Sequence, residues 1–187
     1  MDKIIEVKGF KVPIGDHRRK MIVIGSDHRG FYNIEKDFYP KALLMDYLKQ
    51  EGFVIIDVGT HSKERCDYPK YSFKIGEIVS DDSELQTVGI GLCGSGIGIG
   101  TIATKFNGIY PVFCENTKMA ANSRMHNNTN LLTIGVDEKS PEELIKIVQV
   151  WLNTPFYTDF ENERVYLERF VQTLEFERQI ARINQNS

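Results

Sequence analysis

The sequence has few cysteines and no long hydrophobic segment. Its three cysteines are an odd number without a C-x-x-C spacing, which excludes a disulfide framework and a structural zinc motif and indicates free thiols in a reducing, cytoplasmic setting. No apolar run approaches the roughly 20 residues that a membrane-spanning helix requires, so we expect no membrane insertion. The formal net charge is −3 and no run of basic residues occurs, which argues against a nucleic-acid-binding surface.

Two nucleotide-binding motifs are also missing, although the chain contains a glycine-rich stretch. Gly94, Gly96 and Gly98 begin a G-x-G pattern, but the full dinucleotide fingerprint is broken because Ile99 and Gly100 follow. No Gly-Lys-Ser/Thr sequence completes a P-loop either. A flavodoxin-like or dinucleotide-binding function is therefore disfavoured. The composition, 41% hydrophobic and 26% charged, is that of an ordinary globular domain.

Short apolar segments alternate with helical patterns along most of the chain. This alternation predicts a three-layer α/β/α sandwich, with a five-stranded, Rossmann-like parallel sheet covered by helices on both faces. Residues 1–20 are predicted to be an N-terminal extension with an edge strand or hairpin, and residues 21–187 to form a single domain. We expect an extra C-terminal helix over about 160–183, which packs on this domain or on a partner subunit. The expected strands are 21–25, 53–58, 88–92, 109–114 and 131–136.

The central strand, 88–92, leads into Cys93 and a glycine loop, and a helix is expected to run from near Ile97 to about residue 107. Successive glycines allow positive φ and bring backbone N–H groups close to a ligand, and a helix N-terminus favours negative charge. The loop is predicted to hold an anion or a developing oxyanion; the alternative is a tight turn without a ligand. In such a sheet the strand ends at Asp27, Thr60 and Cys93 should border one crevice.

Five motifs occur in a fixed order: Gly-Ser-Asp-His at 25–28, Asp-Val-Gly-Thr at 57–60, Asp-Tyr-Pro at 67–69, Gly-Leu-Cys-Gly-Ser-Gly-Ile-Gly at 91–98 and Ser-Arg-Met-His-Asn-Asn-Thr-Asn at 123–130. Together they resemble the ribose-5-phosphate isomerase B family, which includes the galactose-6-phosphate isomerase subunits. The resemblance covers about 21–164. It implies a sugar-phosphate isomerase of carbohydrate metabolism, such as the pentose phosphate pathway, that acts through a cis-enediolate without a metal or cofactor. It also implies a homodimer or homotetramer whose active site is shared between subunits.

The resemblance assigns catalytic roles to four residues. Cys93 matches the family's base, and a thiol near a helix N-terminus is expected to have a lowered pKa. Ser95 would assist proton movement between the enediolate oxygens. His126 would open the sugar ring with Asp27 nearby; alternatively, His126 only caps the C-terminus of its helix. Cys114 lies within a predicted strand and is interpreted as an inert buried thiol.

Substrate binding is implied for a wider set of residues. Backbone N–H groups of the glycine loop would hold the enediolate, and His126 and Asn127 would come from the partner of the chain that supplies Cys93. His28 would face the phosphate end, and Tyr68 and Asn127 would contact sugar hydroxyls or the enediolate. The implied substrate-binding residues are His28, Tyr68, Gly94, Gly96, Ile97, Gly98, Asn127, Arg164 and Asp137.

Phosphate recognition departs from the family pattern. Asp137 stands where family members usually carry an arginine after the fifth strand, and Phe160 replaces another arginine, whereas Arg164 matches. Two explanations remain. Either the substrate is a sugar phosphate and other cations bind it, or the substrate is an unphosphorylated or differently shaped sugar whose hydroxyls donate to Asp137. The candidate cations are Arg29, Arg124, Lys70 and Arg169. A non-catalytic sugar or anion sensor is a further alternative, which the intact Cys93 and its partner groups disfavour.

Overall fold

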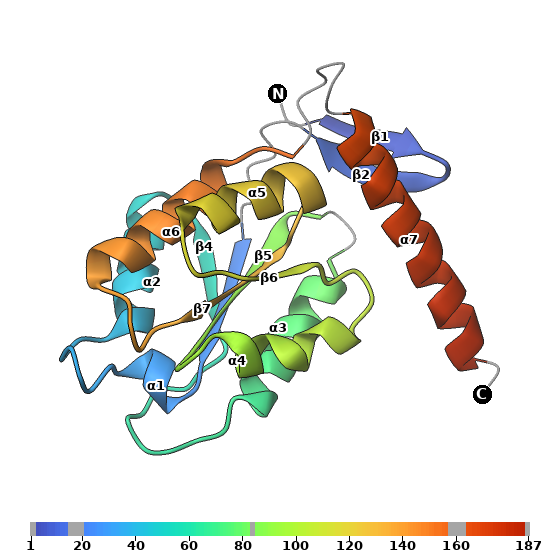
Figure 1. Ribbon diagram of the computed structural model, residues 1–187. Coiled ribbons are helices and arrows are strands. Elements are labelled where there is room, and N and C mark those ends of the chain that lie inside the picture. Colours follow the sequence, from blue (N-terminus) through green and yellow to red (C-terminus); the bar gives the residue numbers. More distant parts are fainter. Residues whose placement is uncertain (1–2, 15–20, 83–84, 157–163, 186–187) are drawn as a thin grey trace.

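The computed structural model describes residues 3–14, 21–82, 85–156 and 164–185 (Figure 1). The predicted five-stranded parallel sheet is confirmed, with the strand order β4-β3-β5-β7-β6. Its strands are β3 (Met21–Ser26), β4 (Val54–Asp57), β5 (Thr87–Cys93), β6 (Pro111–Phe113) and β7 (Leu131–Gly135). The chain passes from β3 to β4 on one side and returns to β5 on the other, so the strand order reverses at β3. Ligands bind at the carboxyl ends of strands at such a switch point.

Helices cover both faces of the sheet, as expected for a three-layer α/β/α fold (Figure 1). One face packs against α2 (Pro40–Gln50), α5 (Thr117–Asn127) and α6 (Pro141–Asn153). The other face packs against α3 (Pro69–Ser80), α4 (Ile97–Thr101) and the 3₁₀ helix η1 (Ala103–Lys105). Alternate residues of the strands supply the two cores: Ile22 and Ile24 of β3 face α2, whereas Val23 faces α3.

Two helices illustrate how local sequence determines their bounds. Ser140 caps α6 through the predicted capping box: its hydroxyl accepts from the backbone N–H of Glu143, and the Glu143 carboxylate accepts from the N–H of Ser140. Helix α4 is shorter than predicted, because it ends at Thr101 instead of near residue 107. Two glycines weaken it, and the N–H of Ala103 donates to the Ser72 hydroxyl of α3 at 2.9 Å rather than to a helical carbonyl.

The N-terminal residues form an antiparallel hairpin, β1 (Lys3–Val7) and β2 (Phe10–Ile14), which packs against α7 (Arg164–Gln185). Val12 and Ile14 of the hairpin share one apolar cluster with Phe170 and Val171 of α7. The far half of α7 extends away from the sheet domain (Figure 1), and it exposes Phe176, Ile180 and Ile183. The helix predicted over 160–183 is therefore present from Arg164; Phe160 lies outside the described residues.

Candidate active site

The predicted crevice, at the carboxyl ends of β3, β5 and β7, is centred on Cys93. This residue ends β5 and is 4% exposed. The chain then turns through Gly96, which has φ +79° and serves as the N-cap of α4. The backbone N–H of Gly96 donates to Cys93 Sγ over 3.2 Å. The predicted strand, glycine loop and helix N-terminus are therefore confirmed as a local structure, with the thiol directed at the loop N–H groups.

Burial raises the pKa of the Cys93 thiol above its ordinary value, and the nearby Asp27 carboxylate raises it further. Backbone N–H groups of Ile99, Gly96 and Ser95 oppose this change, but they do not overcome the loss of hydration. The lowered pKa that we expected from the sequence is wrong for a single chain. The physical reason is that the loss of hydration on burying a thiolate costs more than the nearby backbone N–H groups return.

The glycine loop is fixed by very close backbone contacts. A Cβ atom on Gly96 would lie 2.5 Å from the backbone nitrogen of Gly135 in β7, and a Cβ on Gly135 would lie 2.6 Å from the carbonyl carbon of Ser95. Val136 N donates to Cys93 O at 3.0 Å, which extends the β5–β7 pairing beyond the strands. Only glycine allows the loop to lie this close to β7.

We predict that Gly96→Ala lowers the free energy of unfolding by about 2–4 kcal/mol, because it combines a positive φ with a backbone clash. Gly108→Ala is the matched control: Gly108 has nearly the same φ, +81°, but nothing lies within 4 Å of its added Cβ. Gly108→Ala should lower the free energy of unfolding by about 1 kcal/mol. Urea denaturation measures both. Equal losses of unfolding free energy in the two variants would show that the close backbone contact with β7 contributes nothing to stability.

Asp27 lies near Cys93 because its N–H donates to Leu92 O at 3.2 Å and α1 (His28–Phe31) packs directly on β5. Asp27 is 7% exposed, and its carboxylate caps α1 by accepting from the N–H groups of Arg29 and Gly30 at 2.9 and 3.0 Å. Burial raises the pKa of Asp27 despite these donors. His28 Nδ1 lies 3.0 Å from the carbonyl oxygen of Cys66, which links α1 to the loop before α3.

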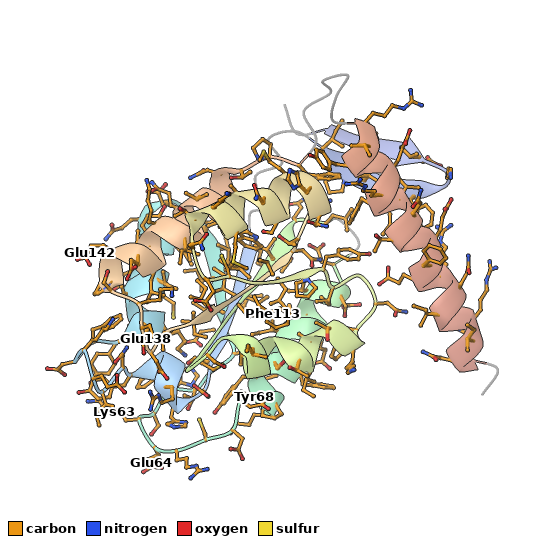
Figure 2. All side chains as sticks on the ribbon, viewed as in Figure 1. Lys63, Glu64, Tyr68, Phe113, Glu138 and Glu142 are labelled. Carbon is orange, nitrogen blue, oxygen red and sulfur yellow. The ribbon has the colours of Figure 1, made fainter. Side chains whose placement is uncertain are left out.

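Tyr68 closes another side of the crevice. Its ring lies over the first turn of α4, since a Cβ on Gly98 would be 2.7 Å from the ring carbons. Figure 2 shows Tyr68 beside α4, with Lys63 and Glu64 on the loop that precedes it and Glu138 on the loop that follows β7. These loops all follow the carboxyl ends of strands. The structure therefore brings together the predicted residues Asp27, His28, Tyr68, Cys93, Gly94, Ser95, Gly96, Ile97, Gly98 and Asp137.

A buried ion pair that the sequence analysis missed supports this crevice. Lys41 of α2 is 2% exposed, and its Nζ lies 2.6 Å from both Asp57 Oδ1 and the carbonyl oxygen of Thr60. Burial alone would raise the pKa of Asp57, but the Lys41 ammonium and the Gly59 N–H outweigh it and leave that pKa below its usual value. Thr60 N in turn donates to Ser26 O at 2.8 Å, so the pair fixes the chain that leads into Asp27.

One chain does not bring His126 and Asn127 to Cys93. Both end α5, which precedes β7, whereas Cys93 pairs with Gly135 at the opposite end of that strand. Since strands rise about 3.3 Å per residue, at least ~13 Å of sheet separates the two ends. Arg164 is also remote from Cys93. Its side chain is 77% exposed, and its Nε donates to the Glu168 carboxylate.

His126 has its own packing partner. Its ring stacks on Tyr166 of α7 with 4.2 Å between centroids and an angle of 17° between planes. The helix is closed by Asn128, whose φ is +49° and whose N–H bonds the carbonyls of Arg124 and Ser123. Asn128 is thus the C-cap residue, and His126 lies in the last turn of α5, so the alternative in which it only serves the C-terminus of that helix stays a prediction. No feature of the sequence indicated Tyr166. Both rings stand near a cavity of about 570 Å³ that is lined in part by Phe113, His126, Asn127 and Arg169.

Asp137 is paired with a cation from α1. Arg29 Nε lies 3.0 Å from Asp137 Oδ1, and Arg29 Nη2 lies 2.7 Å from Oδ2, which is a bidentate geometry. Arg124, another candidate cation, is 5% exposed and donates to Asn128 and to the Thr129 carbonyl, so it supports α5 and not the crevice.

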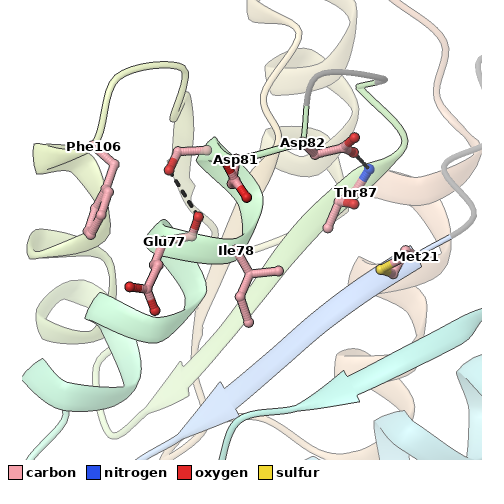
Figure 3. Close-up of a pocket in the computed structure, with 8 residues that line it drawn as sticks. Met21, Glu77, Ile78, Asp81, Asp82, Thr87 and Phe106 are labelled. Atoms are coloured by element: carbon pink, nitrogen blue, oxygen red, sulfur yellow. Dashed lines mark hydrogen bonds between the residues drawn. The ribbon is translucent and has the colours of Figure 1, made fainter.

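A second cavity, of about 660 Å³, lies at the amino end of the sheet (Figure 3). Asp81, Asp82 and Glu77 line it, but Asp82 Oδ2 already accepts from the backbone N–H of Thr87. Throughout the described ranges no three His, Cys, Asp or Glu side chains are placed to share a metal ion. In the same part of the chain, no helix has the length and apolar character needed to cross a membrane.

Known proteins resemble this chain in sequence and in fold. Residues 22–167 match the sequence model of the Ribose/Galactose Isomerase family. Ribose-5-phosphate isomerase B of Escherichia coli (strain K12) is 36% identical over 146 residues, which are 78% of this chain and 92% of that protein. The structure of the Clostridium thermocellum ribose-5-phosphate isomerase B superposes with a TM-score of 0.72 and 36% identity, over 86% of this chain and 99% of the other.

A further solved structure, the Mycoplasma genitalium ribose-5-phosphate isomerase B with bound ribulose-5-phosphate, gives a TM-score of 0.69 at 27% identity over 83% of this chain and 96% of that one. The matched region includes the whole five-stranded sheet and the glycine loop. The chain therefore belongs to the ribose/galactose isomerase family and is an isomerase of the ribose-5-phosphate isomerase B type.

Proposed function

We propose that this isomerase interconverts an aldose phosphate and its ketose, with ribose 5-phosphate as the first candidate, and that Cys93 is the base. The observation that supports this most directly is the buried Cys93 thiol at the start of a glycine loop, with Asp27 and His28 in the same crevice. Binding alone does not require a thiol there. The names of the relatives support the same substrate class.

Isomerisation moves a proton between C2 and C1 of the open sugar. A Cys93 thiolate would take the proton from one carbon and return it to the other, and the intermediate would carry negative charge on its oxygens. Loop N–H groups that are not used within the protein can stabilise that charge, and the Ser95 hydroxyl can move a proton between the two oxygens. Burial raises the pKa of Cys93 in a single chain. Thiolate formation therefore depends on groups that the neighbouring subunit contributes when the complete site assembles.

Ring opening requires an acid or base at the ring oxygen, and His126 is suited to this role. The topology separates His126 from Cys93 within one chain, which supports a homodimer or homotetramer in which Asn127 and His126 come from the neighbouring subunit. Arg164 would come with them, since α7 begins on the same side as the His126–Tyr166 stack. Three free thiols suit a reducing, cytoplasmic setting.

The direct experiment is an isomerisation assay with ribose 5-phosphate, allose 6-phosphate, galactose 6-phosphate and the corresponding free sugars. Turnover of a phosphorylated sugar is expected. Turnover of free sugars alone would support the alternative in which Asp137 accepts hydrogen bonds from hydroxyls. A purified protein that binds sugars or anions but turns over none of them would support a sensor.

A further inference from the structure

The crevice presents one guanidinium beside the glycine loop, and its geometry is fixed. Asp137 lies directly over the loop: a Cβ on Gly94 would be 2.9 Å from Asp137 Oδ2, and Asp137 N donates to Gly94 O over 3.3 Å. From this position Asp137 Oδ1 lies 3.0 Å from Arg29 Nε, and Asp137 Oδ2 lies 2.7 Å from Arg29 Nη2. Arg29 therefore cannot rotate freely, and its guanidinium plane is set by a residue anchored to the loop that carries Cys93.

Arg29 retains hydrogen-bond donors after this pairing. A guanidinium has five N–H groups, and Asp137 accepts from Nε and from one Nη2 position. Glu35 lies 3.6 Å from Nη2, which is too far for a strong hydrogen bond. The Arg29 side chain is 36% exposed. Both Nη1 protons and the second Nη2 proton thus remain for a ligand, in the planar arrangement that suits phosphate oxygens.

The other candidate cations have different positions. Lys70 Nζ lies 4.7 Å from the centre of the ring of Tyr71, which packs with Cys93, but a lysine offers a single point charge and not the planar fork of a guanidinium. Arg169 lines the cavity near His126, at the other end of the sheet. Arg124 is buried beneath Trp151. Of the four replacements that the sequence suggested, Arg29 is the one that bonds to Asp137, the residue that lies over the glycine loop.

We infer that Arg29 is the specificity-determining residue for the phosphate end of the substrate, and that Asp137 is a positioning residue that orients Arg29. This inference rests on the proposed sugar-phosphate isomerase function. Asp137 also offsets one positive charge, so the pair selects a phosphate by directed N–H donors more than by net charge. His28, on the same helix, stands next to Arg29 and completes this end of the site.

The test measures KM and kcat for ribose 5-phosphate, together with competitive inhibition by inorganic phosphate. Arg29→Ala should raise KM and the inhibition constant for phosphate together, by about ten- to hundred-fold, with a much smaller change in kcat, since hydrogen bonds to a charged ligand are lost. Arg29→Lys should give an intermediate increase, because the charge stays but the fork is lost. Lys146→Ala, which removes an exposed cation from α6, is the matched control.

A double variant separates positioning from direct binding. In Arg29→Ala the Asp137 carboxylate is left facing the phosphate, so adding Asp137→Asn should recover part of the lost affinity. If Asp137 instead binds sugar hydroxyls, the double variant will be weaker than Arg29→Ala, which would overturn the inference. Unchanged KM and phosphate inhibition in a folded Arg29→Ala protein would overturn it as well. Absence of wild-type turnover would refute the proposed function itself, which is a distinguishable result.

Discussion

Replacing Cys93 with alanine should lower kcat for isomerisation by about a thousand-fold or more, because Cys93 is the titratable side chain of β5 and lies at the start of the glycine loop. The fold should survive, since Cys93 and alanine differ by one buried sulfur atom and the loop is held by backbone contacts with β7. Stopped-flow or coupled assays of ribose 5-phosphate turnover measure the loss, and calorimetric titration with the ketose product checks that binding remains.

Cys114→Ala is the matched control for this variant. Cys114 is also buried, and burial raises its pKa to about 11, but its thiol donates to the Asn116 carbonyl away from the crevice. The control should keep its turnover. Wild-type kcat/KM should also rise with pH through the pKa that Cys93 has in the assembled site, because the thiolate is the form that accepts the proton. Substantial turnover by the Cys93→Ala protein would remove the thiol from the mechanism.

Two inactive variants should restore activity when they are combined in one oligomer. If Cys93 of one subunit works with His126 of the other, co-expressed Cys93→Ala and His126→Ala chains form mixed dimers with one intact site. Each mixed dimer has one working site of two, so mixed dimers isolated from a symmetric dimeric protein should show about half of the wild-type activity, which is a large gain over either variant alone. Differently tagged chains, purified through both tags and assayed with ribose 5-phosphate, provide the measurement.

The control for complementation pairs Cys93→Ala with the Cys93→Ala/His126→Ala double variant. These chains can form the same mixed dimers, but none of their sites contains a thiol, so no activity should return. Light scattering should show a dimer or larger species for the wild type. An active monomer, or mixed oligomers without recovery, would show that His126 reaches Cys93 within one chain or has no part in the reaction.

The sheet and the crevice could be predicted from the sequence because they depend on local patterns. Short apolar runs define the strands, Ser140 and Glu143 define the start of α6, and the switch-point rule places Asp27 beside Cys93. The length of α4 could not be predicted in the same way. It depends on the hydroxyl of Ser72, which reaches the N–H of Ala103 from a different helix.

The electrostatics of the site were harder to predict than its location. The pKa of Cys93 is set by how deeply the fold buries it, and the sequence shows only the neighbouring glycines. The pairing of Arg29 with Asp137 joins residues that are far apart in the chain, so no spacing reveals it. The stack of His126 on Tyr166 is a similar case, because it depends on where α7 packs. Contacts between distant residues, rather than motifs, determine these features.

The shared core of the hairpin and α7 has a consequence for synthesis on the ribosome. Val12 and Ile14 are 0% and 5% exposed, and Phe170 and Val171 of α7 are among the residues that cover them. At translation rates of about 5–20 residues per second, the hairpin emerges roughly ten to thirty seconds before that helix exists. During this interval the apolar side chains of the hairpin stay exposed while the parallel sheet is already forming. The first strands to be synthesised are therefore among the last to pack.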